Sequence, residues 1–505
     1  MTSETDSGEP ASPPAAPGAG RNPALLPEAL VIPRAEHPIS RQKIAPEALK
    51  VLYRLYRSGY KAYLVGGSVR DLLLKRQPKD FDVVTDASPR QIKELFRNSR
   101  IIGRRFRVVH VVFGKDQVVE VSTFRRRPDP VELAAAEAEN AATPAEDAVE
   151  DAAEDLVEDL SGGEAGAEGE LPEEAEAKRK ADEAEAAPRR TIIDENAFGT
   201  EEEDALRRDI TINGLFYDIA TFSVIDYVGG LSDLHKEVIR TIGDPDERFK
   251  EDPVRIIRAV RHAARTGFAI EPQTLAAIRR HHCLLPTCAP ARVLEEFLRE
   301  LRNGYSYESF RKMLETTVLR TLFPHIADVL GEPPAMEPGP GSPWYRFQVL
   351  DRLRSERGAP PPDSILLAHL MLPLVESEVE ALCDPKSSRV EASRAFDAVR
   401  NRHDQLCREL ALPRRLCALA SAHIIGLCRI RRSLALGGLG KSVVSKSYFA
   451  EAFALYELDA ISRGERPADP QNALSQVPQP AAAGSGASRR RRRRRRGKRP
   501  AGLVS

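Results

Sequence analysis

The stretch "LVGGSVRDLLLKRQPKDFDVVTDASP", residues 64–89, decides the fold of this chain. An apolar run over 62–65 stops at Gly66 and Gly67, and apolar residues at helical spacing follow. This order predicts a strand, a glycine turn and the start of a helix. Backbone N–H groups at such a turn can approach a phosphate because no Cβ stands in the way. Ser68 could cap this helix or bond a phosphate oxygen.

Two carboxylates, Asp80 and Asp82, follow in a run that reads as a buried strand. Side chains two apart on a strand leave the same face, so both are expected to converge on one shared ion. Alone, such a pair is typical of a solvated strand end or turn. A glycine phosphate cradle upstream favours phosphoryl or nucleotidyl transfer, because that chemistry needs both parts.

Charge is unevenly distributed along the 505 residues, although the formal net charge is zero. Residues 131–188 hold 20 Asp and Glu against 3 Lys and Arg, so the rest of the chain carries 72 basic and 55 acidic residues. The basic remainder suits a polyanionic partner, although a solvated basic surface gives the same balance. The acidic segment has few large apolar side chains and is expected to be a solvated insertion; regulation or nucleic-acid mimicry are alternative roles for it.

The six cysteines form no CxxC pair, which predicts reduced thiols and a cytoplasmic location. The cluster His281, His282, Cys283 and Cys288 lacks the paired spacing of a structural zinc site, so we expect no metal there. No window reaches the roughly 18 apolar residues of a membrane span, so we expect a soluble protein.

Eight consecutive arginines lie near the C-terminus. Such a run can bind a phosphate backbone through counterion release, which needs no fold and gives no sequence specificity. A solvated tail is the alternative. We favour RNA binding, and the residues concerned are Arg489, Arg490, Arg491, Arg492, Arg493, Arg494, Arg495 and Arg496.

Local patterns predict further elements. A helix is expected from Ile39 to Tyr60, and another after Ser88 and Pro89, where a cap precedes a first-turn proline. Residues 106–124 form two β-rich runs that should meet in a hairpin at 114–117. From 239 onward the chain is mainly helical, with a Pro and Gly-rich loop at 332–343.

The stretch at 64–89 resembles the head signature of the class II nucleotidyltransferases, the family of bacterial poly(A) polymerases and tRNA CCA-adding enzymes. "RRDITINGLFYD" at 207–218 and "EDPVRIIRAVR" at 251–261 resemble two further blocks of this family. The resemblance covers roughly 31–290, apart from the acidic insertion. It implies an α+β protein, with a small mixed α/β nucleotidyltransferase head followed by an all-helical neck and body.

We accordingly expect seven segments. They are a disordered N-terminus at 1–30, a head at 31–127 and 191–238 interrupted by the disordered acidic insertion at 128–190, a neck at 239–300 that binds the base and RNA, an RNA-binding body at 301–465, and a disordered linker and Arg-rich tail at 466–505.

Three stretches are more similar to the poly(A) polymerase branch than to CCA-adding enzymes: "IIGRRFRVVHVVF" at 101–113, "IPRAEHPISRQKI" at 32–44 and "NAFGTEEEDALRRD" at 196–209. The resemblance implies template-independent addition of AMP from ATP to RNA 3′ ends, with release of pyrophosphate, in RNA 3′ processing and turnover. CCA addition is the alternative within the family. A decayed RNA-binding protein is the alternative from another class, but the DxD pair and the glycine turn are intact. RNA 3′ ends, ATP and RNA-decay proteins are the expected partners of a monomer that binds no membrane.

The resemblance also implies roles for single residues. Asp80 and Asp82 would hold two Mg²⁺ ions, with Glu120 as a third carboxylate unless it is only an exposed position of the hairpin. Phosphate handling is implied for Gly66, Gly67, Ser68 and Arg70, whereas Asp71 would orient Arg70 or cap the helix.

The two later blocks supply the remaining candidates. Arg207 and Asn213 would bind nucleotide, and Asp209 would act in catalysis or only fix neighbouring arginines. Asp252, Arg255 and Arg258 are spaced by three residues and so share one helix face. Asp252 before Pro253 is also an ordinary helix start. The resemblance implies that Asp252 and Arg255 present an acceptor and a donor to the base edge and thereby select the nucleotide.

Overall fold

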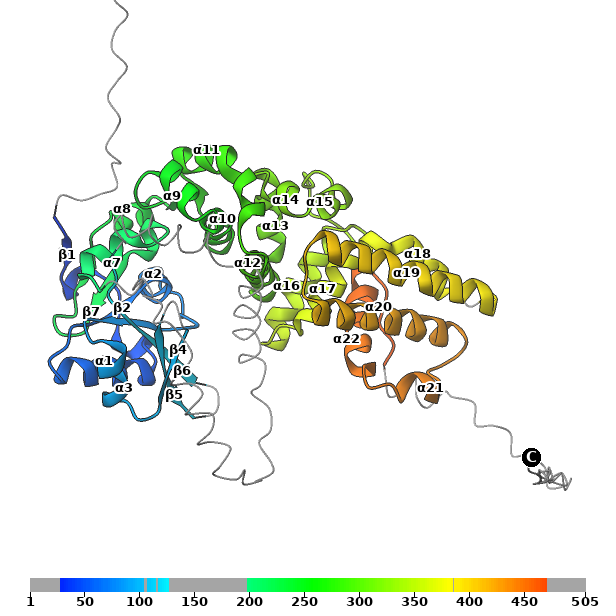
Figure 1. Ribbon diagram of the computed structural model, residues 1–505, viewed down its shortest axis with the longest axis horizontal. Helices are drawn as coiled ribbons and strands as arrows, with labels where there is room; N and C mark the ends of the chain where they lie inside the picture. Colours follow the sequence, from blue (N-terminus) through cyan, green and yellow to red (C-terminus); the bar gives the residue numbers. More distant parts are fainter. Residues whose placement is uncertain (1–27, 104–106, 115–116, 127–197, 385, 470–505) are drawn as a thin grey trace, which may run out of the picture.

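The computed structural model describes residues 28–103, 107–114, 117–126, 198–384 and 386–469. They form an elongated arch with a mixed α/β head at one end and helices at the other (Figure 1). The N-terminal segment, the acidic insertion and the arginine run at 489–496 lie outside the described residues. The predictions for those segments therefore stay predictions.

An eight-stranded sheet forms the head, in the order β1-β8-β7-β2-β3-β6-β5-β4. The central strand β2 is buried at all four positions, as its unbroken apolar sequence requires. Strands β3 and β6 are parallel and the other neighbours are antiparallel. The strands are β1 (Leu30–Ile32), β2 (Ala62–Val65), β3 (Asp82–Thr85), β4 (Ser99–Ile102), β5 (Val108–Phe113), β6 (Gln117–Thr123), β7 (Leu215–Asp218) and β8 (Val224–Asp226).

Helix α1 (Pro46–Arg57) packs on the sheet through buried residues spaced by three and four, from Ala48 to Leu55. It begins seven residues later than predicted. Pro46 occupies its first turn and Ala45 before it is extended, so the helix cannot reach back to Ile39. The predicted helix at Ser88 is confirmed as α3 (Pro89–Leu95), with a capping box between Ser88 and Gln91.

The predicted strand, glycine turn and helix are confirmed by β2, Gly66 and α2 (Gly67–Leu73). Gly66 has φ +69°, a conformation that residues with a Cβ rarely adopt. A Cβ there would also approach Nη1 of Arg208 to 3.4 Å. Ser68 lies inside the helix, and its hydroxyl donates to the Val65 carbonyl oxygen (2.9 Å), so the prediction that Ser68 caps α2 is wrong.

The hairpin is confirmed by the antiparallel pairing of β5 with β6. Beyond it, Arg125 forms an antiparallel bridge with Phe198. The amide of Gly199 donates to the Phe124 carbonyl oxygen (3.0 Å). The chain therefore re-enters the head beside the point at which it leaves for the acidic segment, and the geometry of the head is continuous across this insertion.

The second part of the head contains α7 (Glu201–Arg207) and α8 (Gly230–His235). Helices make up most of the chain after the head. They are α9 (Pro245–Glu251), α10 (Val254–Thr266), α11 (Pro272–His281), α12 (Pro290–Arg302), α13 (Ser306–Glu315), α14 (Val318–Leu322), α15 (Pro324–Leu330), α16 (Tyr345–Arg357), α17 (Asp363–Met371), α18 (Glu376–Cys383), α19 (Arg389–Glu409), α20 (Arg414–Ala435), α21 (Lys441–Val444) and α22 (Phe449–Ser462). The neck was predicted to be all-helical, but it also contains a short parallel strand pair, Ala269–Ile270 with Val238–Ile239. The predicted loop at 332–343 separates α15 from α16.

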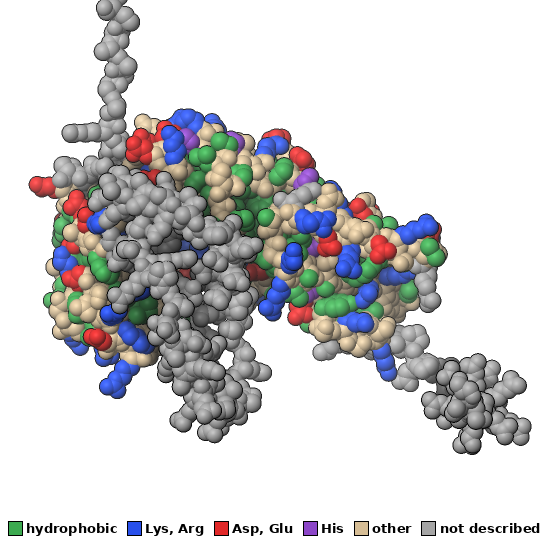
Figure 2. Space-filling view, in the orientation of Figure 1, with side chains coloured by type: hydrophobic (Ala, Val, Ile, Leu, Met, Phe, Trp, Pro, Cys, Tyr) green, Lys and Arg blue, Asp and Glu red, His purple; other side chains and the backbone are tan. Residues whose placement is uncertain are grey.

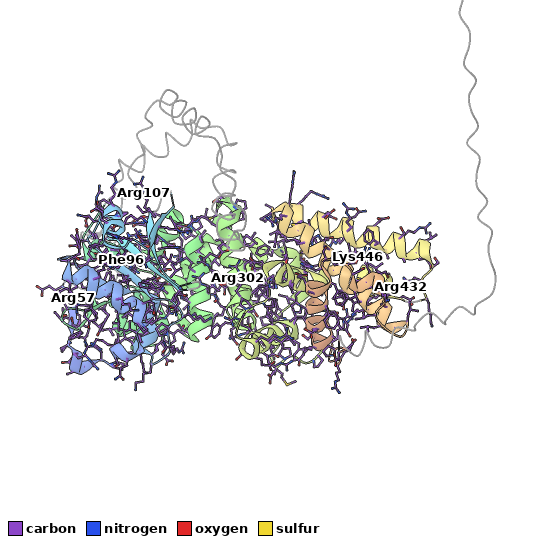
Figure 3. The ribbon with its side chains drawn as sticks, turned by 90° about the horizontal axis from the view of Figure 1, so that it is seen from below. Arg57, Phe96, Arg107, Arg302, Arg432 and Lys446 are labelled. Carbon is purple, nitrogen blue, oxygen red and sulfur yellow. The ribbon has the colours of Figure 1, made fainter. Side chains whose placement is uncertain are left out.

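Arg302, labelled in Figure 3, joins the neck to the body. Its Nε and Nη2 donate to the two carboxylate oxygens of Asp363 on α17 (2.7 and 2.6 Å), and Nη1 donates to Glu295 (2.9 Å). Such a bidentate pair fixes direction as well as distance. Among the helices that the structure describes, none is long and apolar enough to cross a membrane.

Candidate active site

An open cavity of about 600 Å³ lies between the head sheet and the neck helices. Ten Lys and Arg and six Asp and Glu line it, so it has a cationic surplus. It brings together all of the sequence-predicted site residues within the described part of the chain: Gly66, Gly67, Ser68, Arg70, Asp80, Asp82, Glu120, Arg207, Asp209, Asn213, Asp252, Arg255 and Arg258.

Carboxylates gather at the head end of this cavity. Asp82 opens β3 and lies opposite Glu120 on the parallel strand β6. Asp80 precedes the strand, so the prediction that both aspartates lie on it is wrong, although both border the cavity. Burial raises the pKa of Asp82 to about 6, and the charge of Glu120 adds to this rise. The positive charge of Arg208 opposes it. Burial and Asp80 likewise raise the pKa of Glu120, against the charge of Arg299.

This donor set fits Mg²⁺. Burial and then neighbouring carboxylates raise the pKa values of Asp82 and Glu120, so both groups gain from a nearby cation, and Mg²⁺ prefers oxygen ligands. Within the described ranges no three His, Cys, Asp or Glu side chains are grouped so as to hold a metal ion. Mg²⁺ is usually bound by one or two carboxylates together with water and substrate phosphates, so the arrangement suits a site that nucleotide completes.

Two arginines of the "RRD" block are fixed beside the glycine turn. Asp204, 1% exposed, accepts from Nη2 of Arg208 (2.9 Å) and from Nε of Arg207 (3.1 Å). The Arg208 guanidinium also lies over the Phe216 ring, 5.3 Å from its centroid. Burial would raise the pKa of Asp204, but the two guanidinium groups hold it below its usual value. A phosphate at Gly66 would therefore meet a positioned cation.

A buried network joins α2 to α10. Arg70 has no exposed surface; it donates twice to Oδ1 of Asp71 (2.9 and 2.8 Å) and once to Oδ1 of Asn213 (2.8 Å). The other oxygen of Asp71 accepts from Arg265 on α10 (2.7 Å). Asp71 thus orients Arg70, as one of its two predicted roles required. The prediction that Arg70 contacts phosphate conflicts with its burial; Arg70 instead supports Asn213, which also bonds His262 (3.2 Å).

Asp209 is buried and holds Arg258. Its Oδ2 accepts from Nε of Arg258 (2.8 Å), and its Oδ1 accepts from the Ile210 amide (2.9 Å). Burial would raise the pKa of Asp209, but Arg258 and the other partners hold it far below the usual range. Asp209 therefore carries a fixed negative charge, and fixing an arginine is the role that its contacts support. A catalytic part for Asp209 stays a prediction.

The neck end of the cavity is built at the start of α10. Asp252 is not the N-cap, because the helix begins at Val254 after Pro253, but its Oδ1 accepts from the Val254 amide (3.3 Å). Its Oδ2 accepts from Arg292 (2.9 Å). Arg255 donates to Glu251 (3.1 Å). Arg255 and Arg258 lie on α10 and Asp252 precedes it, so the three do not share one helix face as predicted, although all of them border the cavity.

Six cations of the cavity were not predicted from the sequence: Lys79, Arg208, Arg261, Arg265, Arg292 and Arg299. Those on α10 repeat the helical spacing of Arg258, and those on α12 are two turns apart, so helical periodicity was the available signal. The histidines of the Cys and His cluster have other partners. His281 bonds Asp246 (2.7 Å) and His282 bonds Thr321 (2.6 Å), and all six cysteines are free thiols.

A buried glutamate behind the cavity makes stability depend on pH. Glu300 on α12 is 2% exposed, and burial raises its pKa from 4.5 to about 7 against the charge of Arg261. The folded state binds the Glu300 proton more tightly than the unfolded state does. The stability that this protonation contributes is therefore fully present below about pH 4.5 and is lost as pH rises through 7. Glu300→Gln should therefore raise the free energy of unfolding by about 1–3 kcal/mol at alkaline pH and leave it unchanged in acid.

Urea unfolding of the two proteins at both pH values measures this difference. The matched control is Glu295→Gln, an exchange on the same helix at a partly exposed side chain. If Glu300→Gln raised the free energy of unfolding equally at acid and alkaline pH, the raised pKa of Glu300 would not be the cause.

Strand carboxylates beside a glycine turn, facing a cation-lined cavity, define a nucleotidyltransferase. The family model "Poly A polymerase head domain" matches residues 62–160 and 166–240, and "Probable RNA and SrmB-binding site of polymerase A" matches 267–330. Poly(A) polymerase I of Escherichia coli O157:H7 is 37% identical over 441 residues, which cover 86% of this chain and 82% of that protein. The chain belongs to the poly(A) polymerase family.

Further relatives are similar to this chain to different extents. The Salmonella typhimurium Poly(A) polymerase I is 38% identical over 440 residues (86% of this chain, 82% of that protein), whereas the CCA-adding enzyme of Bacillus subtilis is 30% identical over 281 (56% of each). A solved structure of the Bacillus stearothermophilus CCA-adding enzyme in complex with CTP has a TM-score of 0.41 at 22% identity, covering 83% of this chain and 93% of that one.

Proposed function

We propose that this chain is a template-independent poly(A) polymerase that adds AMP from ATP to RNA 3′ ends. In this reaction the 3′-hydroxyl oxygen bonds to the α-phosphorus, the bond to the pyrophosphate breaks and the hydroxyl loses its proton. The observation that carries the proposal is that carboxylates suited to this transfer share one cavity with an acceptor and donor pair from the protein. A protein that reads the base itself has no need of a template.

Each end of the cavity has a part in this reaction. Mg²⁺ held by Asp80 and Asp82, with Glu120 beside them, would lower the pKa of the 3′-hydroxyl and neutralise the triphosphate. The backbone at Gly66 and the Arg208 guanidinium bind phosphate oxygens. Two Mg²⁺ ions are the expected complement of this carboxylate set.

At the neck end, Arg292 orients the Asp252 carboxylate, while Glu251 orients the Arg255 guanidinium. Asp252 accepts from the exocyclic amine of adenine, and Arg255 donates to a ring nitrogen. Asp209 holds the guanidinium of Arg258, which borders the same cavity. Because these groups are held by neighbours, they discriminate between bases without first having to become ordered.

The decisive experiment offers the purified chain each of the four nucleoside triphosphates, with an oligoadenylate primer and with a tRNA lacking its CCA end. We expect long homopolymers of A on either RNA, with Mg²⁺ present. Ordered addition of C, C and A to tRNA, with no homopolymer on the primer, would instead establish CCA addition. Binding of both RNAs without any incorporation would establish a decayed RNA-binding protein.

RNA and nucleotide are the partners that this function requires, and we propose that the run Arg489–Arg496 tethers RNA without specificity. Lys and Arg side chains are also distributed over the head and the body on the face shown in Figure 2. Each RNA phosphate neutralised adds about 0.7 to the slope of log affinity against log salt for single strands. Deleting residues 489–496 should therefore flatten that slope without changing which nucleotide is added.

Filter binding of oligoadenylate over a range of salt concentrations measures the slope. Deleting the acidic insertion is the opposite experiment, because its carboxylates compete with RNA for the same cations; it should tighten binding at low salt. Equal slopes for the full chain and the tail-deleted chain would show that the tail does not bind RNA.

A further inference from the structure

A second cavity, of about 290 Å³, borders the head sheet away from the nucleotide cavity. Most of its lining comes from "IPRAEHPISRQKI", residues 32–44, a stretch that the transfer reaction leaves without a role. The lining residues are Arg34, Ser40, Arg41, Gln42, Tyr217 and Phe222. They include two cations and no carboxylate.

Strand register places this cavity on the opposite face of the sheet from the catalytic carboxylates. Asp82 pairs with Val65, and Val65 pairs with Phe216, so these three side chains share one face. Tyr217 pairs with Leu64 and projects from the other face, because neighbouring side chains on a strand alternate. A ligand in the second cavity is therefore separated from the nucleotide by the sheet.

Tyr217 forms the floor of the second cavity. It is 1% exposed, and its ring packs edge-on against His37 with centroids 6.0 Å apart. Its hydroxyl makes no hydrogen bond with any residue that the structure describes. Burial raises the pKa of Tyr217, and the positive charges of Arg34 and Arg41 oppose this rise, so both guanidinium groups lie near the phenol. Because Tyr217 lines the cavity, its hydroxyl is available to a ligand there.

The two arginines retain unused donors. Arg34 donates through Nη1 to the His37 carbonyl oxygen (3.0 Å), and Arg41 donates through Nη1 to the Tyr53 hydroxyl (2.9 Å). The Arg41 guanidinium lies over the Phe222 ring, 4.6 Å from its centroid, which holds its plane in place. Both arginines are exposed and neither forms an ion pair with a described residue, so both charges are available to an anion in the cavity.

We propose that this cavity binds one oxyanion of the phosphate class. Guanidinium forks match phosphate geometry, and the Tyr217 hydroxyl supplies a further donor from the floor. Ser40 accepts from the Gln42 amide (3.4 Å), which leaves its own hydroxyl proton to donate. Two cations and no carboxylate line the cavity, so it favours an anion that accepts hydrogen bonds. The phosphate belongs to an RNA backbone or to a free phosphate compound, and the two sources are distinguishable.

The proposal is tested by binding, so it does not depend on the proposed transferase activity. Equilibrium dialysis with radiolabelled inorganic phosphate, without Mg²⁺, compares the full chain with the double variant Arg34→Gln and Tyr217→Phe. Tyr217→Phe keeps the buried ring and removes only the hydroxyl. The matched control is Arg57→Gln, which removes one exposed positive charge of α1 at the outer edge of the head (Figure 3). Thermal unfolding establishes that each variant is folded.

We expect the double variant to lose one phosphate site per chain, while the control keeps it and phosphate in the nucleotide cavity is unaffected. In a second arm, the salt dependence of oligoadenylate binding identifies the source. A slope lower by about 0.7 in the double variant, but not in the control, identifies an RNA phosphate. An unchanged slope with the site lost identifies a free phosphate compound. Wild-type phosphate binding together with a wild-type slope in the folded double variant would overturn the proposal.

Discussion

Replacing Asp82 with Asn should lower the rate of AMP transfer by roughly 10³-fold or more, because a catalytic metal supplies several kcal/mol of transition-state stabilisation. Asp82 opens β3 opposite Glu120, and together with Asp80 it is the proposed Mg²⁺ ligand. Asn keeps the size of the side chain and removes its charge. Because Glu120 repels the Asp82 carboxylate, this exchange should not destabilise the metal-free protein.

Single-turnover extension of an oligoadenylate primer measures the rate, and binding of the same primer without ATP measures RNA affinity. The control is Asp86→Asn, on the same segment but outside the cavity, where the carboxylate accepts from the Lys61 amide (2.8 Å). We expect a normal rate for the control, and normal RNA affinity for both variants. A rate for Asp82→Asn within a few-fold of wild type would remove Asp82 from the metal site.

The second large effect concerns the choice of base. Arg255→Ala should lower the ratio of kcat/KM for ATP to that for CTP by roughly 10–100-fold, because a site that bonds one base strongly rejects another that leaves its polar groups unpaired. Arg255 borders the cavity together with Asp252, and its guanidinium is held by Glu251. Losing its donor removes discrimination more than it weakens binding of the triphosphate.

The matched control is Arg299→Ala, which removes a cavity cation whose charge acts on Glu120 at the carboxylate end. It should reduce kcat/KM for both nucleotides by the same factor and leave their ratio unchanged. Competition between labelled ATP and CTP on one primer gives the ratio directly. If Arg255→Ala slowed both nucleotides equally, as the control does, its assignment to the base would be wrong.

The parts of the site that the sequence could predict are those whose signal is local. A strand, two glycines and a helix start are contiguous, and the hairpin that carries Glu120 has its turn within four residues. The parts it could not predict depend on neighbours distant in the chain. The sequence predicted that Arg70 binds phosphate, whereas in the structure Arg70 is buried and donates to Asn213, which lies 143 residues away in the chain.

Helix boundaries show the same limit. Asp252 and Pro253 are an ordinary start signal, but the helix begins one residue later, at Val254, and the Asp252 carboxylate also bonds Arg292 from α12. Likewise, Arg292 and Arg299 are unremarkable surface arginines in the sequence. Only the packing of α12 against α10 brings them to the cavity, and no local pattern encodes that packing.

The clasp that Arg70, Asp71, Asn213 and Arg265 form between α2 and α10 bears on how such enzymes can be recombined. Its hydrogen bonds are directional, and those of Arg70 are buried, so they fix the orientation of head and neck more tightly than apolar packing alone. The effects of substitutions on stability are not additive for residues that share one hydrogen-bond network. Head and neck are therefore not interchangeable modules: a chimera between two relatives would inherit a working cavity only if it took the whole clasp from one parent.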